Sequence, residues 1–273
     1  MARRPPLGQH FLADPAILAR IVAALDPRPD DVVIEIGPGK GSLTRVLAPR
    51  VRTVIGIEKD RRLAAECGVR NAECGIENAA VVQGDALRLS WHALLDAHTD
   101  TPHSALRIPH FKVVGNIPYA ITSPLIDKAL TPPVPERVVF LVQREVADRV
   151  AAPPGSKTYG ALSVGVQAVC RVEQLFGVKR GAFVPPPRVD SALLRLTPLA
   201  EPLVRPEEVA AFRVFVTACF SRRRKQLRNV VMAATGRPAA AVAAGLAALD
   251  LDPAARPETL APREFARLLR WSP

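Results

Sequence analysis

Residues 32–41 read VVIEIGPGKG, and this stretch decides the fold that we expect. Its short β-branched run predicts a strand that is buried on both faces. In the turn that follows, the backbone can approach a ligand closely, because the turn contains Gly37, Gly39 and Gly41. A helix then begins near Ser42, which stands where the dinucleotide-binding fingerprint GxGxxG has its third glycine. The stretch therefore favours a nucleotide-type ligand without indicating a pyrophosphate, and an ordinary strand-to-helix turn is the alternative.

The composition favours a polyanionic partner. Lys and Arg number 37 and Asp and Glu 26 in 273 residues, which gives a formal net charge of +11. Nucleic acid is the partner that such a basic chain fits best. Hydrophobic residues make up 48% of the chain, but no apolar run approaches the ~18 residues of a membrane-spanning helix, so we expect a soluble protein. The opening residues, MARRPP, lead into no apolar segment, which argues against a secretion signal.

Cysteine and histidine spacing predicts neither disulfides nor a metal site. No CxxC pair or metal-ligand spacing occurs among the four cysteines, Cys67, Cys74, Cys170 and Cys219, so we expect free thiols in a reducing cytoplasm. Three histidines fall within residues 96–110, a stretch rich in Thr, Asp and Pro that is typical of a surface loop: His98, His103 and His110. Their spacing suits no common zinc arrangement, and we expect no metal.

Further apolar runs predict a sheet whose strands end in polar residues. We expect strands at residues 53–58, 79–83, 111–115 and 137–143, with a closing pair at 170–178 and 191–196. Glu58 ends the first of these strands 21 residues after Gly37, about where a carboxylate would accept the ribose hydroxyls of a nucleoside. The alternative is a cap for the helix that begins near Asp60. Asp85, after the strand at 79–83, could accept from an adenine amino group.

The strand at 111–115 leads into the most informative tetrapeptide, Asn116-Ile117-Pro118-Tyr119. An exocyclic amine on adenine is a poor nucleophile, and acceptors at its two N–H groups favour a pyramidal nitrogen. The Asn116 side-chain oxygen and a backbone carbonyl beside Pro118 could supply these acceptors, while Tyr119 offers a face on which the base stacks. With an activated methyl donor, the protein chiefly has to position the reactants. The alternative is plain loop punctuation.

Nine stretches together resemble one enzyme class. GQHFL, EIGPGKGSLT, IEKD, GDAL and NIPY occur in this order, followed by LVQREVADR, SKTYGALSV, FVPPPRVDSAL and FSRRRKQLRN. The set resembles the motifs of S-adenosylmethionine-dependent rRNA adenine N6-methyltransferases. The SKTYGALSV stretch and the RRK helix favour the KsgA/RsmA family, which dimethylates two adjacent adenosines in a hairpin loop near the 3′ end of small-subunit (16S) rRNA, over the Erm enzymes of large-subunit rRNA.

The resemblance implies a role for each matching residue. It places Gly37 and Gly39 at the methionine end of S-adenosylmethionine, Glu58 on the ribose, Asp85 on the adenine, and Asn116 against both cofactor and target base. His10 and Leu12 would close over the cofactor, and Tyr119 and Phe183 would form the aromatic walls of the base pocket. Two positions depart from the family pattern: His10 stands where Asn is usual, and Ala120 replaces the polar residue that often follows the tyrosine.

We expect a Rossmann-like α/β methyltransferase domain at residues 1–198 and a smaller all-α, rRNA-binding domain at 199–273. The second segment lacks strand runs and holds 12 Arg and Lys against 7 Asp and Glu. Its densest basic cluster comprises Arg222, Arg223, Arg224, Lys225 and Arg228. Phosphate contact is one interpretation of this cluster, and a solvated helix face is the other.

The expected function is S-adenosylmethionine-dependent dimethylation of 16S rRNA within small ribosomal subunit particles, by a monomer in the cytoplasm. Three alternatives remain. An Erm-type methylase of 23S rRNA would share the motifs, whereas a dehydrogenase would require nicotinamide and leave NIPY unexplained. A ribosome assembly factor whose binding matters more than its catalysis would need the same basic surfaces.

Overall fold

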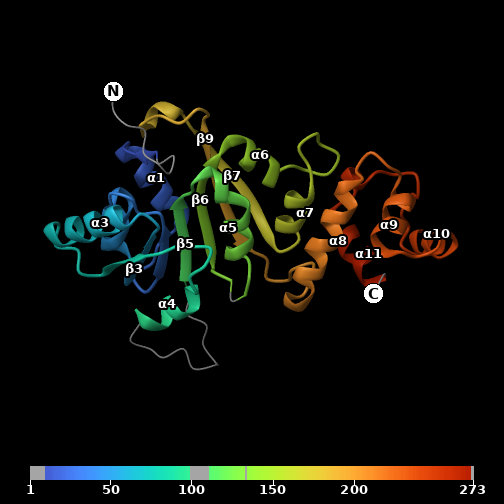
Figure 1. Cartoon of the computed structure of the whole chain (residues 1–273), viewed down its shortest axis with the longest axis horizontal. Coiled ribbons are helices and arrows are strands. Elements are labelled where there is room, and N and C mark those ends of the chain that lie inside the picture. The colour runs from blue at the N-terminus through green and yellow to red at the C-terminus, as the bar shows by residue number, and fades with distance from the viewer. Residues whose placement is uncertain (1–9, 99–110, 133, 272–273) are drawn as a thin grey trace. The chain divides into compact units, whose positions relative to one another are not determined.

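The computed structural model describes residues 10–98, 111–132 and 134–271, and it divides the chain into two compact units (Figure 1). Unit 1 comprises Met1–Ala147 and Glu173–Thr197, and unit 2 comprises Asp148–Val172 and Pro198–Pro273. Two of the histidines that we weighed as metal ligands, His103 and His110, lie outside the described residues.

Within the described residues, unit 1 is built on a seven-stranded sheet of order β4-β3-β2-β5-β6-β9-β7. The strands are β2 (Val32–Ile36), β3 (Thr53–Glu58), β4 (Ala79–Gln83), β5 (Phe111–Asn116), β6 (Arg137–Gln143), β7 (Cys170–Val178) and β9 (Ser191–Pro198). The five strands from β4 to β6 are parallel, and β9 pairs antiparallel with β6. The expected Rossmann-like sheet is thus confirmed.

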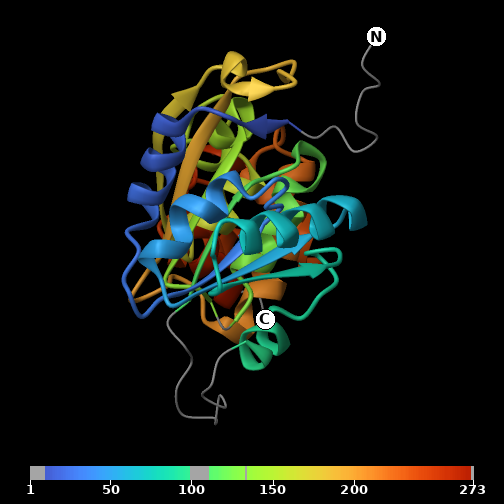
Figure 2. The same cartoon turned by 90° about the vertical axis from the view of Figure 1, so that its left-hand side faces the viewer.

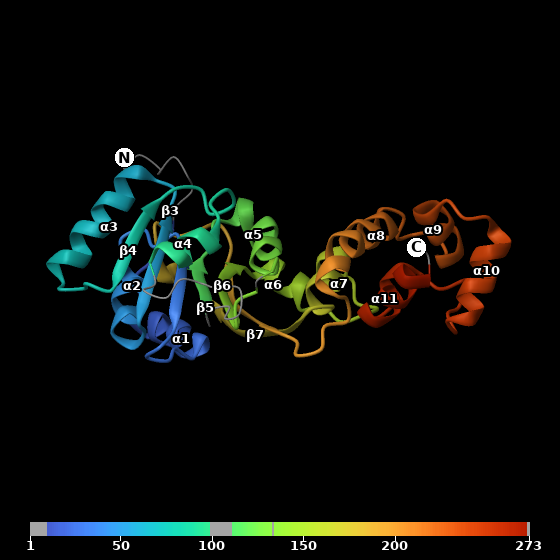
Figure 3. The ribbon, with the colours of Figure 1, turned by 90° about the horizontal axis from the view of Figure 1, so that it is seen from below.

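Helices cover both faces of this sheet; Figure 3 shows α1 (Pro15–Leu25) on one side of the strands and α5 (Thr122–Ala129) on the other. The Asp14 side chain caps α1 by accepting from the N–H groups of Ala16 and Ile17, which otherwise lack partners in the first turn. The remaining helices of the unit are α2 (Ser42–Leu47), α3 (Arg61–Glu73) and α4 (Trp91–Ala97), with α6 (Arg144–Val150) at the passage to unit 2.

Apolar residues of α1 and α2 share one core with the sheet. Leu18, Ile21, Val22 and Leu25 from α1 and Leu43 and Leu47 from α2 pack with Val33, Val54, Val114 and Val139. Each of these side chains is at most 8% exposed. At about 1.5–3 kcal/mol for each fully buried large side chain, this core holds the strand ends in place.

A two-stranded ladder lies beside this core. β1 (Phe11–Leu12) pairs antiparallel with β8 (Phe183–Val184), as Figure 2 shows. Phe11 lies opposite Val184 and Leu12 opposite Phe183. Because successive side chains of a strand point to opposite faces, this register decides which of the four reach the core.

Unit 2 is helical and resumes at Pro198, within one residue of the expected boundary, but it also includes Asp148–Val172. Its helices are α7 (Ala161–Gln167), α8 (Val209–Ser221), α9 (Leu227–Thr235), α10 (Ala239–Ala248) and α11 (Pro262–Trp271). Residues 148–172 belong here because their apolar side chains join the core of the C-terminal helices. Tyr159 is fully buried in that core, and its hydroxyl donates to the Leu260 carbonyl at 2.9 Å.

No single helix of the described residues is long and apolar enough to cross a membrane. Taken together, α9 and α10 are long and apolar enough, but the chain bends by 116° between them.

Candidate active site

One pocket in unit 1 gathers most of the residues with an expected cofactor or catalytic role. Its lining consists of His10, Phe11, Gly37, Gly39, Glu58, Asn116, Ile117, Pro118 and Tyr119. Seven of these nine carry a cofactor or catalytic expectation, and they come from four separate stretches of the chain.

The parallel register explains this gathering. Ile36 of β2 pairs with Gly115 of β5 and with Ile57 of β3, so Gly37, Asn116 and Glu58 come next at the same carboxyl edge. β2 lies between β3 and β5, and ligands of open α/β sheets bind outside the carboxyl ends of such strands.

Two positions of the glycine turn require glycine. Gly37 and Gly39 have φ values of +67° and +57°, which side chains other than glycine rarely adopt. A Cβ on Gly39 would also lie 2.9 Å from the Phe11 ring. Any side chain at position 39 would therefore strain the backbone and displace Phe11.

Glu58 binds the glycine turn instead of capping the next helix. One carboxylate oxygen accepts from the Gly39 N–H at 3.0 Å and the other from the Asp60 N–H at 2.9 Å. The Asp60 side chain caps α3 by accepting from the N–H groups of Arg62 and Leu63. A carboxylate accepts about four hydrogen bonds, so Glu58 keeps capacity for two hydroxyl donors.

The Asn116 amide is oriented by the backbone of His10, the first residue that the structure describes. Its Nδ2 donates to the backbone carbonyl of His10 at 2.7 Å. The Oδ1 atom is thereby the acceptor end of the amide in a pocket that Asn116 lines. Nothing about the His10 side chain is needed for this bond.

Tyr119 is half-buried at the start of the 3-10 turn η2 (Tyr119–Ile121). Its hydroxyl lies 3.2 Å from Ser191 Oγ, the first residue of β9. Burial raises the pKa of Tyr119, and the negative charge of Asp190 adds to this effect while the hydrogen bond with Ser191 opposes it. The ring is thus held from its hydroxyl end as a neutral, flat surface.

Comparison with known proteins shows the family of this chain. The family model described as ribosomal RNA adenine dimethylase matches residues 2–253. The chain belongs to this family. It is 42% identical over 266 residues to the "Ribosomal RNA small subunit methyltransferase A" of Nitratidesulfovibrio vulgaris (strain Hildenborough), covering 96% of this chain and 93% of that protein.

Solved structures show the same fold over nearly the whole dimethylase. A dimethyladenosine transferase from Plasmodium falciparum has a TM-score of 0.79 and 28% identity, covering 95% of this chain and 96% of that one. The 23S rRNA methyltransferase ErmE has a TM-score of 0.70 and 31% identity, covering 96% and 99%. The dimethylase is therefore an S-adenosylmethionine-dependent rRNA adenine methyltransferase with a Rossmann-like fold.

Phe183, for which the resemblance implies a place in the wall of the base pocket, does not line this pocket. Its side chain is only 2% exposed and packs in the core of α1 and the sheet. The reason is the ladder register: Phe183 and its partner Leu12 point to the core, whereas Val184, 63% exposed, points away from it. On β1, Phe11 is the residue that lines the pocket.

Two other expected cofactor residues, Leu12 and Asp85, do not line this pocket. Leu12 is buried and lines a second, adjoining hollow together with Gly37 and Asn116. Asp85 accepts from Lys59 Nζ at 2.9 Å and from the Leu87 N–H at 3.0 Å. The hydrogen bond from Lys59 holds the pKa of Asp85 below its ordinary value.

Sequence reasoning missed Phe11 and Ile117, which line the pocket, and Ser191, which lies within hydrogen-bond distance of the Tyr119 hydroxyl. Phe11 and Ile117 stand inside the motifs GQHFL and NIPY, and Ser191 follows the proline-rich stretch that begins at Phe183. Only pairing between distant segments reveals their roles. The sequence assigns no function to Glu35, the acidic residue of the stretch VVIEIGPGKG.

The residues present fit the S-adenosylmethionine of this family. Gly37 and Gly39 line the pocket with backbone alone, and Glu58 retains acceptor capacity for a ribose. At the adenine end the fit rests on Asp85, which would exchange its contact with Lys59, a side chain that is 60% exposed, for the base amino group.

We expect Glu58→Ala to weaken S-adenosylmethionine binding by about 1–3 kcal/mol, the cost of lost hydrogen bonds to a charged group. Calorimetry measures this. Glu58→Gln is the matched control, because it keeps an acceptor oxygen for Gly39 while removing the charge, and it should bind more tightly than the alanine variant. Unchanged affinity in Glu58→Ala, at unchanged thermal stability, would remove Glu58 from the site.

Glu35 is a buried carboxyl beneath the glycine turn. It is 2% exposed, and Thr44 Oγ1 donates to its Oε2 at 2.6 Å. Burial raises the pKa of Glu35 to about 7, although the hydrogen bond from Thr44 lowers it. At a pH between 4.5, the ordinary pKa of a glutamate, and about 7, Glu35 therefore keeps its proton in the folded state and has lost it in the unfolded state.

This difference predicts a loss of stability with rising pH. Between pH 4.5 and 7 the folded state binds more protons than the unfolded state, so the free energy of unfolding falls, by about 3 kcal/mol in all. Glu35→Gln should abolish this contribution, which urea unfolding at pH 5 and pH 8 would reveal. Glu77→Gln, an exposed control, should retain it. Equal pH dependence in wild type and Glu35→Gln would contradict the assignment.

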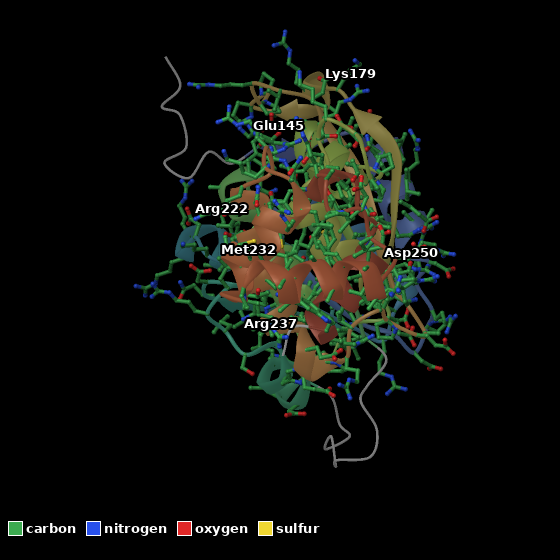
Figure 4. All side chains as sticks on the ribbon, turned by 90° about the vertical axis from the view of Figure 1, so that its right-hand side faces the viewer. Glu145, Lys179, Arg222, Met232, Arg237 and Asp250 are labelled. Carbon is green, nitrogen blue, oxygen red and sulfur yellow. The ribbon has the colours of Figure 1, made fainter. Side chains whose placement is uncertain are left out.

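The basic cluster lies in unit 2 on a turn, not on one helix face. α8 ends at Ser221 and α9 begins at Leu227, so only the last member of the cluster is helical. All five side chains are exposed, and no ion pair is recorded for them among the described residues: Arg222, Arg223, Arg224, Lys225 and Arg228. Figure 4 labels Arg222 at the surface.

Proposed function

We propose that this dimethylase transfers methyl groups from S-adenosylmethionine to the N6 amines of two adjacent adenosines in a hairpin loop near the 3′ end of 16S rRNA. The observation that carries the proposal is the Asn116 amide, fixed by the His10 carbonyl with Oδ1 as its acceptor end, in one pocket with Gly37, Gly39 and Glu58. The cofactor supplies an activated methyl group on a sulfonium. The protein has only to position the target amine against this methyl group.

Two acceptors direct the amine. Asn116 Oδ1 takes one N–H, and a backbone carbonyl of the NIPY turn takes the other. The Pro118 carbonyl already accepts from the Ile121 N–H at 3.1 Å, so we assign this role to the carbonyl of Ile117, which lines the pocket. As the lone pair forms the nitrogen–carbon bond, the carbon–sulfur bond breaks and one N–H proton passes to water.

The small-subunit substrate is favoured by the curated relatives. The protein that is 42% identical to this chain is named a small-subunit rRNA methyltransferase, whereas ErmE, 31% identical, is named a 23S rRNA enzyme. An Erm-type activity is the second candidate. We further propose that the enzyme acts in the cytoplasm and as a monomer.

Transfer of labelled methyl groups to isolated ribosomal particles separates these candidates. We expect incorporation into small-subunit particles from cells that lack this modification and none into large-subunit particles. Incorporation into large-subunit rRNA alone would favour the Erm-type activity. Tight particle binding without methyl transfer would favour a non-catalytic assembly factor.

We further propose that the basic turn of unit 2 holds RNA phosphates. Replacing Arg222, Arg223 and Lys225 with alanine should weaken RNA binding and reduce its salt slope by roughly 0.7–0.9 per lost contact, with S-adenosylmethionine affinity unchanged. The measurement is RNA affinity against salt concentration. A salt slope equal to that of wild type would show that the cluster is a solvated turn that makes no phosphate contacts.

A further inference from the structure

The segment of residues 185–191 touches the pocket at both of its ends. At its first residue, the Pro185 carbonyl lies 2.8 Å from the ring Nδ1 of His10. At its last residue, Ser191 Oγ lies 3.2 Å from the Tyr119 hydroxyl. His10 and Tyr119 both line the pocket, so this segment borders it.

Asp190 holds basic residues at the second end of this segment. Its Oδ1 accepts from the backbone N–H of Arg180 at 3.0 Å, and its Oδ2 accepts from Lys179 Nζ at 3.1 Å. These two contacts fix the start of the 3-10 turn η3 (Arg180–Ala182). The Asp190 carbonyl also accepts from the backbone N–H of Arg144 at 3.1 Å. Three basic residues are thereby gathered beside the pocket border.

Positive charge is in excess at this border. Residues 144–145 and 179–191 contain four Lys and Arg against two Asp and Glu. All four cations are exposed: Arg144, Lys179, Arg180 and Arg188. Within the part of the chain that the structure describes, the three arginines form no ion pair. Figure 4 labels Lys179, with its side chain 84% exposed, and the acid Glu145 at the surface.

The donors of η3 are largely free for a ligand. A lysine ammonium has three N–H donors and an arginine guanidinium has five. Asp190 accepts one from Lys179 and, from Arg180, only the backbone N–H. An exposed ion pair such as Lys179 with Asp190 contributes little to stability, so another anion can share the ammonium at low cost.

We propose that Lys179 and Arg180 bind phosphate groups of the RNA backbone next to the target adenosine. The inference rests on the proposed function, in which the target base enters the pocket. Enzymes that act on a base take it out of the stack, so the backbone of the extruded nucleotide stays at the border of the pocket. Lysine and arginine side chains there contact phosphates and set the position of the strand without reading its sequence.

Replacing Lys179 and Arg180 together with alanine should weaken binding of the RNA hairpin and lower its salt slope by about 1.4, since each single-strand phosphate contact contributes about 0.7. Lys179→Arg combined with Arg180→Lys keeps both charges and should stay near the wild-type slope. Arg50→Ala combined with Arg52→Ala is the control for net charge. Both residues are exposed and precede β3, at the end of the strands opposite the pocket, so this variant should keep the wild-type slope.

Neutral methylphosphonate linkages test whether the phosphate charge is what these residues recognise. Placed singly beside the target adenosines of the hairpin, at least one linkage should weaken binding to wild type. The same linkage should not weaken binding to the double alanine variant further, because that contact is already lost.

An unchanged salt slope in a double alanine variant that unfolds at the wild-type temperature would overturn the inference. Methylphosphonates that leave binding to wild type unaffected at every flanking position, or that weaken both proteins equally, would also overturn it. Failure of the proposed function would look different, since wild-type protein would then leave small-subunit particles unmethylated.

Discussion

Asn116→Ala should lower the single-turnover rate of methyl transfer by about 100-fold while leaving RNA affinity nearly unchanged. The size follows from the loss of one preorganised polar group at the reacting atom, which typically costs this much in the chemical step. The acceptor matters most when the amine becomes pyramidal, so its removal affects the transition state more than the ground state.

The measurement is single-turnover transfer to small-subunit particles, with RNA and S-adenosylmethionine affinities determined separately. Removing Asn116 Nδ2 also deprives the His10 carbonyl of its hydrogen bond, which could destabilise the protein. Thermal unfolding of the variant therefore has to accompany the kinetics. Transfer at the wild-type rate by a stable Asn116→Ala protein would show that the amide is not the acceptor.

Tyr119→Ala should weaken productive binding of the target base by roughly 1–3 kcal/mol, the contribution of one stacked base, while Tyr119→Phe should be the milder change. Phenylalanine keeps the ring and loses only the hydrogen bond to Ser191. Ser191→Ala removes the same bond from the other side, so it should match Tyr119→Phe. These effects appear in kcat/KM for the particle substrate.

Equal damage in Tyr119→Phe and Tyr119→Ala would contradict a stacking role. If Ser191→Ala were equally impaired, the hydroxyl contact rather than the ring face would be what the reaction needs. Unchanged S-adenosylmethionine affinity in all three variants would confine the effect to the RNA base.

The strand ends of the site could be predicted because their signals are local. Largely apolar runs of five residues, followed by Gly37, Glu58 and Asn116, indicate parallel strands, and parallel strands bring their carboxyl ends to one edge. The ladder of β1 and β8 was not predictable in this way. Its two-residue strands are separated by 170 residues of sequence, and a shift of one residue would exchange Phe183 with Val184.

The same reasoning explains the boundary between the units. Residues 148–172 follow a buried strand of unit 1, and nothing local in them indicates that Tyr159 reaches Leu260. The sequence likewise predicts a helix for the basic cluster, because its residues are good helix formers. In the structure the chain turns between Ser221 and Leu227. Long-range packing decided both outcomes.

Mass spectrometry of small-subunit rRNA, after incubation of unmodified particles with S-adenosylmethionine and the purified protein, tests the central claim most directly. We predict N6,N6-dimethyladenosine at two adjacent positions of a hairpin loop near the 3′ end with wild-type protein, and unmodified adenosines with Asn116→Ala. Unmodified adenosines at both positions after incubation with wild-type protein, or methylation found only in large-subunit rRNA, would contradict it.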